Sequence, residues 1–133
     1  MVRRLVKARS LIDRAYDEPL TLSDLAAEAC MSDAHFVRQF RAEFGITPYR
    51  CLTERRLQAA RELLAETDMP VADIVAETGF GNRSAFSRLF KSRCGISPQA
   101  YRLRRRRQRK APEDQRIQET PRHGGWFAAA ASN

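Results

Sequence analysis

The sequence contains an internal repeat with a period of about fifty residues. Residues 21–29 align with residues 70–78 at an offset of 49, and residues 36–48 align with residues 86–98 at an offset of 50. The matching positions combine apolar side chains, glycines and prolines, which is hard to obtain by chance. Two copies are too few for a stacked solenoid, so the repeat predicts a helical unit that has been duplicated.

Each copy is predicted to form a short helix, a tight turn and a second helix. Thr21 and Asp24 are spaced like a capping box at the start of the first helix, and Gly79 gives the backbone freedom that a turn requires. Ser32 and Asn82 are favourable N-caps for the second helix of each copy. In these second helices an apolar side chain recurs at every fourth position, which predicts one buried face: Phe36, Phe40 and Phe44 in the first copy and Phe86, Phe90 and Cys94 in the second.

Three more helices are predicted around the two copies. One precedes the first copy, a long one separates the copies, and another begins at Pro98. No segment shows the pattern of a strand. The sequence therefore predicts an all-α fold of seven helices with two helix-turn-helix subdomains. The predicted parts are a first subdomain (3–47), a linker helix (48–67), a second subdomain (68–107) and a basic, then flexible, C-terminal tail (108–133).

Several classes of site have no support in the sequence. Cys30, Cys51 and Cys94 are far apart, form no CxxC motif and have no histidine at metal-ligand spacing. We expect all three to lie in apolar helical surroundings as small hydrophobic residues. No glycine-rich phosphate loop and no nucleophile elbow is present. The sequence therefore predicts no catalytic residue, no metal site and no cofactor, and the chain is not expected to be an enzyme.

Positive charge is concentrated in the C-terminal part of the chain. The formal net charge is +8, and eleven Lys and Arg residues lie between Glu77 and Glu113 with no acidic residue among them. Such a stretch favours a polyanion as the partner, whereas a merely solvated basic surface fits the charge equally well. The densest run, residues 102–110, would either extend a phosphate contact or form a flexible solvated segment.

No apolar run in the sequence reaches the roughly 18 residues that are needed to cross a bilayer. The first residues also lack the apolar region of a signal peptide. We therefore expect no membrane partner and a cytoplasmic location.

The face opposite the buried aromatic residues is left exposed on each second helix. Arg can contact guanine through two hydrogen bonds, Ser can donate or accept, and Ala or Val can meet a thymine methyl group. A linker helix of some 20 residues spans roughly 30 Å, close to the turn of about 34 Å that separates equivalent sites on B-DNA. The second helices, about residues 32–44 and 82–94, are therefore predicted to recognise an asymmetric bipartite site on double-stranded DNA. Their outward positions are Asp33, Ala34, Val37, Arg38 and Arg41 in the first and Arg83, Ser84, Ser87, Arg88 and Lys91 in the second.

The second copy resembles the signature of the AraC/XylS family of transcription regulators. That signature reads I-A-x-x-x-G-F-x-x-x-S-x-F-x-R-x-F-K, then G-x-[ST]-P-x-x-Y-R, and residues 74–102 read IVAETGFGNRSAFSRLFKSRCGISPQAYR. Residues 52–64 look like the family's central helix, and the resemblance covers about residues 5–103. The sequence departs from the pattern at Cys30, which replaces the turn glycine, and at Val75, which replaces the usual Ala.

The resemblance implies a bipartite DNA-binding domain, gene activation more often than repression, and contact with RNA polymerase. The first helix face has fewer hydrogen-bonding groups than the second, which suggests readout of shape and methyl groups or a supporting role. By similarity, base contacts fall on Ala34, Val37 and Arg38 in the first copy and on Arg83, Ser84, Ala85 and Arg88 in the second, with Lys91 near phosphate and Arg41 as a further outward cation.

Many members of this family carry a ligand-sensing or dimerisation domain before the DNA-binding unit. Here about 20 residues precede the first helix-turn-helix motif, which is too few for a domain that forms a pocket. We therefore expect no small-molecule effector pocket within this chain. The interpretations that stay open are a small stand-alone regulator, the C-terminal part of a larger ligand-sensing regulator, and a helical module that binds proteins or RNA.

Overall fold

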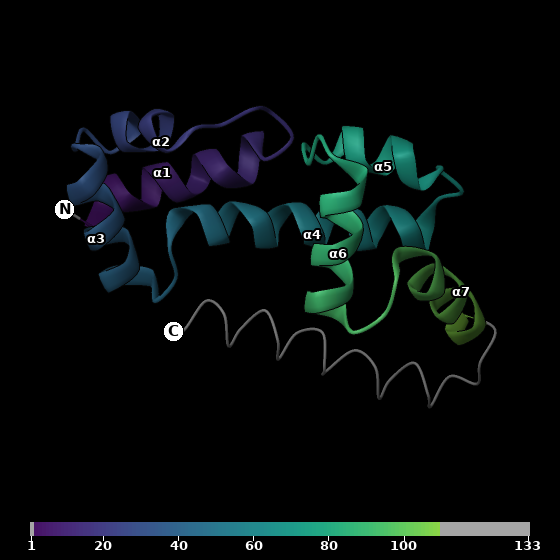
Figure 1. Ribbon diagram of the computed structural model, residues 1–133. Coiled ribbons are helices and arrows are strands. Elements are labelled where there is room, and N and C mark those ends of the chain that lie inside the picture. Colours follow the sequence, from purple (N-terminus) through teal and green to yellow (C-terminus); the bar gives the residue numbers. More distant parts are fainter. Residues whose placement is uncertain (1, 110–133) are drawn as a thin grey trace. The chain divides into compact units, whose positions relative to one another are not determined.

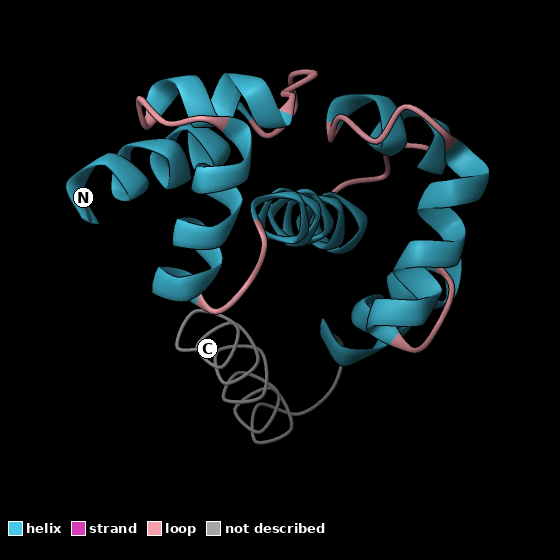
Figure 2. Cartoon of the chain, turned by 60° about the vertical axis from the view of Figure 1, so that its left-hand side comes forward, coloured by secondary structure: helices cyan, strands magenta, loops and turns pink. Residues whose placement is uncertain are grey.

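The computed structural model describes residues 2–109, and α-helices joined by short loops make up this part of the chain (Figure 1). Figure 2 shows no strand among the described residues. The prediction of an all-α fold with seven helices is confirmed for this part of the chain. Most of the predicted tail, residues 110–133, lies outside the described residues. The helices are α1 (Val2–Ala15), α2 (Leu22–Glu28), α3 (Asp33–Phe44), α4 (Pro48–Glu66), α5 (Val71–Glu77), α6 (Arg83–Cys94) and α7 (Pro98–Arg109).

The helices form two compact units, and the division lies inside α4, between Arg55 and Arg56. The first unit contains α1, α2, α3 and the first part of α4, and the second contains the rest of α4 with α5, α6 and α7. Each unit has a hydrophobic core of its own.

The core of the first unit is built around the aromatic face of α3. Phe36 and Phe40 are fully buried, with ring centroids 5.5 Å apart. Phe44 packs on Phe40 at 4.6 Å and is half-buried, and the guanidinium of Arg9 lies 4.9 Å from the Phe44 ring centroid. This cation–π contact joins α1 to the end of α3. The buried residues of this core are Leu5, Ala8, Ile12, Leu25, Ala26, Ala29, Phe36, Phe40 and Leu52.

The second unit repeats this arrangement around α6. Phe86 and Phe90 are fully buried, with ring centroids 5.7 Å apart. Phe80 from the preceding turn packs on Phe86 at 4.9 Å, and Tyr101 of α7 packs on Phe90 at 5.6 Å. The aromatic side chains therefore fix the orientation of α6 about its own axis. The buried residues of this core are Leu57, Ala60, Leu64, Val71, Ile74, Val75, Phe86 and Phe90.

The predicted caps fix where α3 and α6 begin and end. Ser32 Oγ and Asn82 Oδ1 each accept a hydrogen bond from the backbone N–H three residues further on, at 3.3 Å and 2.9 Å. Gly45 and Gly95 terminate the helices with φ angles of 76° and 85°. This left-handed conformation is nearly free of steric cost for glycine, so both α3 and α6 end at a defined residue.

The turn inside each motif also has a residue with a positive φ angle at the equivalent position. Gly79 has this role in the second unit with φ of 83°, and Cys30 has it in the first unit with φ of 55°. Cys30 is exposed, so the expectation that it lies in an apolar helical environment is wrong: turn geometry, not packing, decides its place. Cys51 and Cys94 are half-buried and pack against the two cores, as expected.

Candidate nucleic-acid interface

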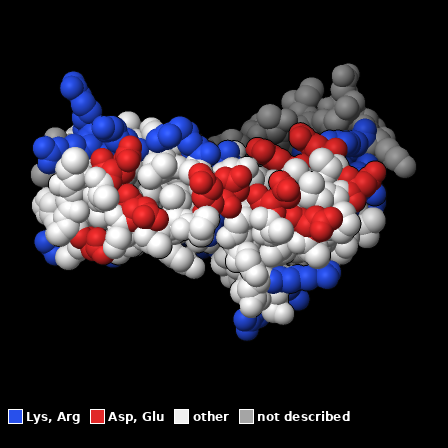
Figure 3. All heavy atoms as spheres, turned by 90° about the horizontal axis from the view of Figure 1, so that it is seen from above, with Lys and Arg blue, Asp and Glu red and all other residues white. Residues whose placement is uncertain are grey.

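The two helices of each motif differ in charge. In both units the first helix, α2 or α5, carries two acidic residues and no basic one. The second helix of the second unit, α6, carries four basic residues and no acidic one, whereas α3 carries two arginines and two acids. Figure 3 shows that both acidic and basic side chains are exposed on the surface seen from above. Within each motif, the second helix is therefore the one with basic side chains to offer an anionic partner.

On α3 the exposed stripe lies opposite the buried phenylalanines. Ala34, Arg38 and Arg41 follow one another at i, i+4 and i+7, and all three are exposed. Val37, which the sequence analysis also places outward, is half-buried because it lies at the border between this stripe and the aromatic face. Three of the four predicted contact residues on α3 thus share one open surface.

The same stripe recurs on α6. Ser84, Arg88 and Lys91 occupy the positions equivalent to the α3 stripe. Neither these side chains nor the two arginines of the α3 stripe form an ion pair with another residue between 2 and 109. Their charge is therefore not neutralised within the described part of the chain. All five predicted contact residues of α6 are exposed: Arg83, Ser84, Ala85, Arg88 and Lys91.

The two recognition helices begin differently. α3 begins with Asp33, whose Oδ2 accepts a hydrogen bond from Ser23 Oγ of α2 at 2.8 Å. α6 begins with Arg83, and the residue equivalent to Ser23 is Ala72, which has no side-chain polar group. Helical periodicity predicts that Asp33 lies on the outward face but gives no sign of this contact, because the contact joins residues ten positions apart across a turn. The signal in the sequence that could have indicated this contact is a hydroxyl residue in the first helix, Ser23, together with a carboxylate at the start of the second, Asp33.

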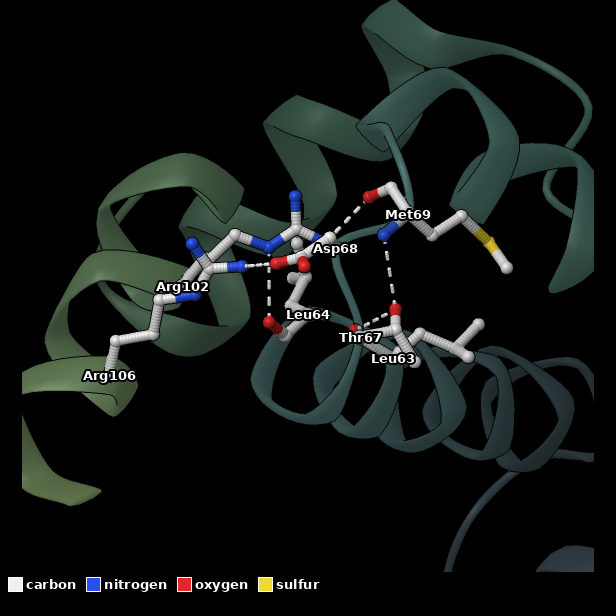
Figure 4. A network of polar contacts seen from close by, with 7 residues as sticks. All are labelled: Leu63, Leu64, Thr67, Asp68, Met69, Arg102 and Arg106. Carbon is white, nitrogen blue, oxygen red and sulfur yellow. Dashed lines mark hydrogen bonds and ion pairs between the residues drawn. The ribbon is translucent and has the colours of Figure 1, made fainter.

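The basic run that begins at Arg102 is helical as far as Arg109, so the alternative of a flexible segment is wrong for residues 102–109. Arg102 is only 7% exposed, and it donates to the carbonyl oxygens of Leu64 and Met69 (Figure 4). The prediction of a phosphate contact is therefore wrong for Arg102, because its guanidinium donates its hydrogen bonds within the second unit.

A second arginine of α7 also turns toward the end of α4. Arg106 Nη2 pairs with Asp68 Oδ1, as Figure 4 shows. Arg104 and Arg107 are exposed and pair with no acid among the described residues. The basic run is thus divided into arginines that hold the fold together and arginines that face solvent.

Other kinds of site find no support between residues 2 and 109. No group of three or more His, Cys, Asp and Glu side chains there is arranged to hold a metal ion. None of the helices in this range has the length and apolar character that crossing a membrane requires.

Known proteins share the sequence pattern over most of the described region. Residues 25–104 match the sequence pattern of a family described as "Helix-turn-helix domain". The transcriptional activator NphR of Rhodococcus sp is 43% identical over 99 residues, which are 74% of this chain and 29% of that protein. The arabinose operon regulatory protein of Salmonella typhimurium is 31% identical over 90 residues, which are 68% of this chain and 32% of that protein. The chain therefore spans about a third of the length of these relatives.

Solved structures share the fold as well. The DNA-binding domain of the global transcriptional factor AdpA, crystallised with a target DNA, has a TM-score of 0.77 and 30% identity, over 82% of this chain and 98% of that one. The C-terminal domain of AraT, a response regulator from Geobacillus stearothermophilus, has a TM-score of 0.71 and 32% identity, over 74% and 83% of the two chains. The resemblance stated from the sequence is thus confirmed, and the chain belongs to the AraC/XylS family of helix-turn-helix proteins.

Proposed function

We propose that the chain is the DNA-binding part of a transcription regulator, and that α3 and α6 read double-stranded DNA in two successive major grooves. The observation that carries this proposal is the repeated stripe of exposed, unpaired side chains opposite a fully buried pair of phenylalanines. A helix that reads base edges needs a polar face whose direction is fixed, and core packing of the aromatic face provides it.

α6 is the main reading element in this proposal. Arg88 contacts guanine O6 and N7 in the middle of the helix, while Arg83, Ser84 and Ala85 meet base edges near its N-terminal end. Lys91 lies further along the same stripe and contacts phosphate. The absence of any acid on α6 supports this assignment, since no carboxylate on this helix repels the DNA backbone.

α3 reads the other half of the site. Arg38 has the position equivalent to Arg88 and contacts a base edge, and Arg41 lies beyond it toward phosphate. Ala34 and the exposed part of Val37 offer methyl groups, which suit contact with thymine and with groove shape. In this arrangement residues 3–47 and 68–107 each cover one half-site, and the linker helix of residues 48–67 sets the distance between them.

The relatives support a proposal for the regulatory outcome. NphR is named as a transcriptional activator, which supports gene activation, and with it contact between the regulator and RNA polymerase at the cytoplasmic nucleoid. The relatives are about three times longer than the matched segment. We therefore place the response to any small effector outside residues 2–109 and assign this part of the chain to DNA recognition alone.

The proposal is tested by comparing the affinity for random duplex DNA with the affinity for a duplex selected from a randomised library. A sequence-specific regulator gives a ratio of at least about 10³ at moderate salt. Arg88→Ala should lower the affinity for the selected duplex. Arg14→Ala on α1 is its matched control, because Arg14 is also exposed and its substitution removes the same charge. Equal affinity for every DNA and RNA would instead support an RNA-binding or non-specific module, and binding to no nucleic acid would support a protein-interaction domain.

A further inference from the structure

The carboxylate of Asp33 is held in place by the neighbouring helix of its motif. Ser23 Oγ, in the first turn of α2, donates a hydrogen bond to Asp33 Oδ2 at 2.8 Å. Both residues are exposed, and the bond joins the N-terminal ends of α2 and α3 across the turn. Residues at the N-terminal end of a recognition helix are those that contact base edges. Asp33 therefore presents an oriented acceptor at the end of α3 that would enter the groove.

The second unit forms without this pair, although the pair also stabilises the first unit. An acid in the first turn does stabilise a helix through its dipole, and a hydrogen bond between two helices can brace a turn. The second unit, however, has Ala72 and Arg83 at the equivalent positions, and α6 still begins at its Asn82 cap. A carboxylate on a surface that meets DNA also weakens phosphate binding. What Asp33 can add to the first unit is selectivity.

The chemistry of the carboxylate indicates which base it selects. An ionised carboxylate only accepts hydrogen bonds. In the major groove cytosine presents the N4 amino donor, whereas guanine presents two acceptors that a carboxylate repels. Ser23 engages Oδ2, so Oδ1 keeps its full capacity to accept from a base.

We propose that Asp33 reads cytosine at one base pair of the half-site contacted by α3, and that Ser23 is the residue that positions it. This inference rests on the proposed function, since it requires α3 to lie in the major groove. It assigns the two units different chemistry: the first selects with an oriented carboxylate in addition to Arg38, whereas the second has no acid on α6 and selects with arginines and Ser84.

The test compares the site preferences of full-length variants on duplexes that are randomised over roughly three helical turns. Asp33→Asn replaces the acceptor-only carboxylate by an amide, which donates and accepts in the pattern that adenine presents. The preferred base at one position should therefore change from cytosine to adenine. Asp33→Ala should lose discrimination at that position by about 5- to 150-fold. Ser23→Ala should keep cytosine but discriminate less, because the carboxylate is no longer oriented.

Glu43→Gln is the matched control, because Glu43 is an exposed acid on the same helix and lies at its opposite end. Its removal should raise affinity slightly for all duplexes and leave every base preference unchanged. The inference is overturned if Asp33→Asn behaves like Glu43→Gln, or if every position at which the wild-type chain prefers cytosine still prefers cytosine in Asp33→Asn. A wild-type chain without any base preference would contradict the proposed function itself and is distinguishable from both of these outcomes.

Discussion

Arg102 donates from Nε to the carbonyl oxygen of Leu64 at 3.1 Å and from Nη2 to that of Met69 at 2.6 Å. The last carbonyl groups of a helix have no partner within the helix, and Arg102 of α7 supplies partners both to the end of α4 and to the loop that follows it. At the equivalent position the first unit has Leu52, which is buried in its apolar core. The two copies of the repeat thus have different chemistry at this equivalent position.

Replacing Arg102 should therefore destabilise the second unit. Arg102→Ala removes two charge-assisted hydrogen bonds and leaves two carbonyl groups short of a partner, which should cost about 2–3 kcal/mol of the free energy of unfolding. Arg102→Lys should recover only part of the loss, because an ammonium group lacks the planar fork of the guanidinium. Urea denaturation of the full chain measures the change. Arg104→Ala is the control, because Arg104 is exposed and should change stability by no more than about 0.5 kcal/mol. Equal effects of the two alanine variants would contradict the structural role of Arg102.

Replacing the strained residue in the turn of the first unit should instead raise the free energy of unfolding. Cys30 has a φ angle of 55°, where a side chain with a Cβ atom meets steric strain. Cys30→Gly should raise the free energy of unfolding by roughly 0.5–1 kcal/mol, since the relief of strain exceeds the entropy that glycine gains in the unfolded chain. Gly79→Ala at the equivalent turn should lower it by about 1–2 kcal/mol. Thermal unfolding of both variants checks the pair, and a loss of stability on Cys30→Gly would show that the thiol contributes contacts which outweigh the strain.

Arg83 should lower the stability of the fold and raise the affinity for DNA. It is the first residue of α6, where the positive end of the helix dipole disfavours a cation. Arg83→Asp should therefore stabilise the fold by roughly 0.5–1.5 kcal/mol, while the affinity for DNA falls because a cation at the interface becomes an anion. Chemical denaturation and DNA titration of the same variant measure the two effects. A variant that gains stability and keeps its DNA affinity would remove Arg83 from the interface.

The cysteines should differ in reactivity. Burial raises the pKa of Cys51 from 9.0 to about 11, and the nearby charge of Arg9 lowers it only in part. At pH 8 its thiolate fraction is then about 100-fold below that of a thiol at the ordinary value, so alkylation should be slow. Cys30 is exposed and should be modified first, as mass spectrometry of the alkylated peptides would show. Because the folded state holds the Cys51 proton more tightly than the unfolded state, this group also makes folding less stable as pH rises from about 9 to about 11. Rapid modification of Cys51 in the folded protein would contradict its burial.

The repeat predicts the fold because each of its signals is local. The aromatic spacing of Phe36 and Phe40, and the cap at Ser32, depend only on residues within one or two helical turns. The role of Arg102 could not be predicted in this way, because it lies in a basic run and its carbonyl partners are more than thirty positions away. Asp33 is similar, since its hydrogen bond depends on how the turn brings α2 and α3 together. Local patterns therefore predict which face of a helix is open, and the tertiary contacts decide which open side chains are free to bind.

Base reading by this chain depends most directly on Arg88, and a base-by-base affinity profile of Arg88→Ala against the wild-type chain on the selected duplex tests it. Arg88→Ala should lose about 1–3 kcal/mol of binding free energy on that duplex, with discrimination lost at one base pair and kept at all the others. The same profile for Arg38→Ala should identify a second position about one helical turn, or roughly 10 base pairs, from the first. A loss that is uniform across all sequences for both variants would contradict the account, because the two arginines would then bind the DNA backbone without reading it.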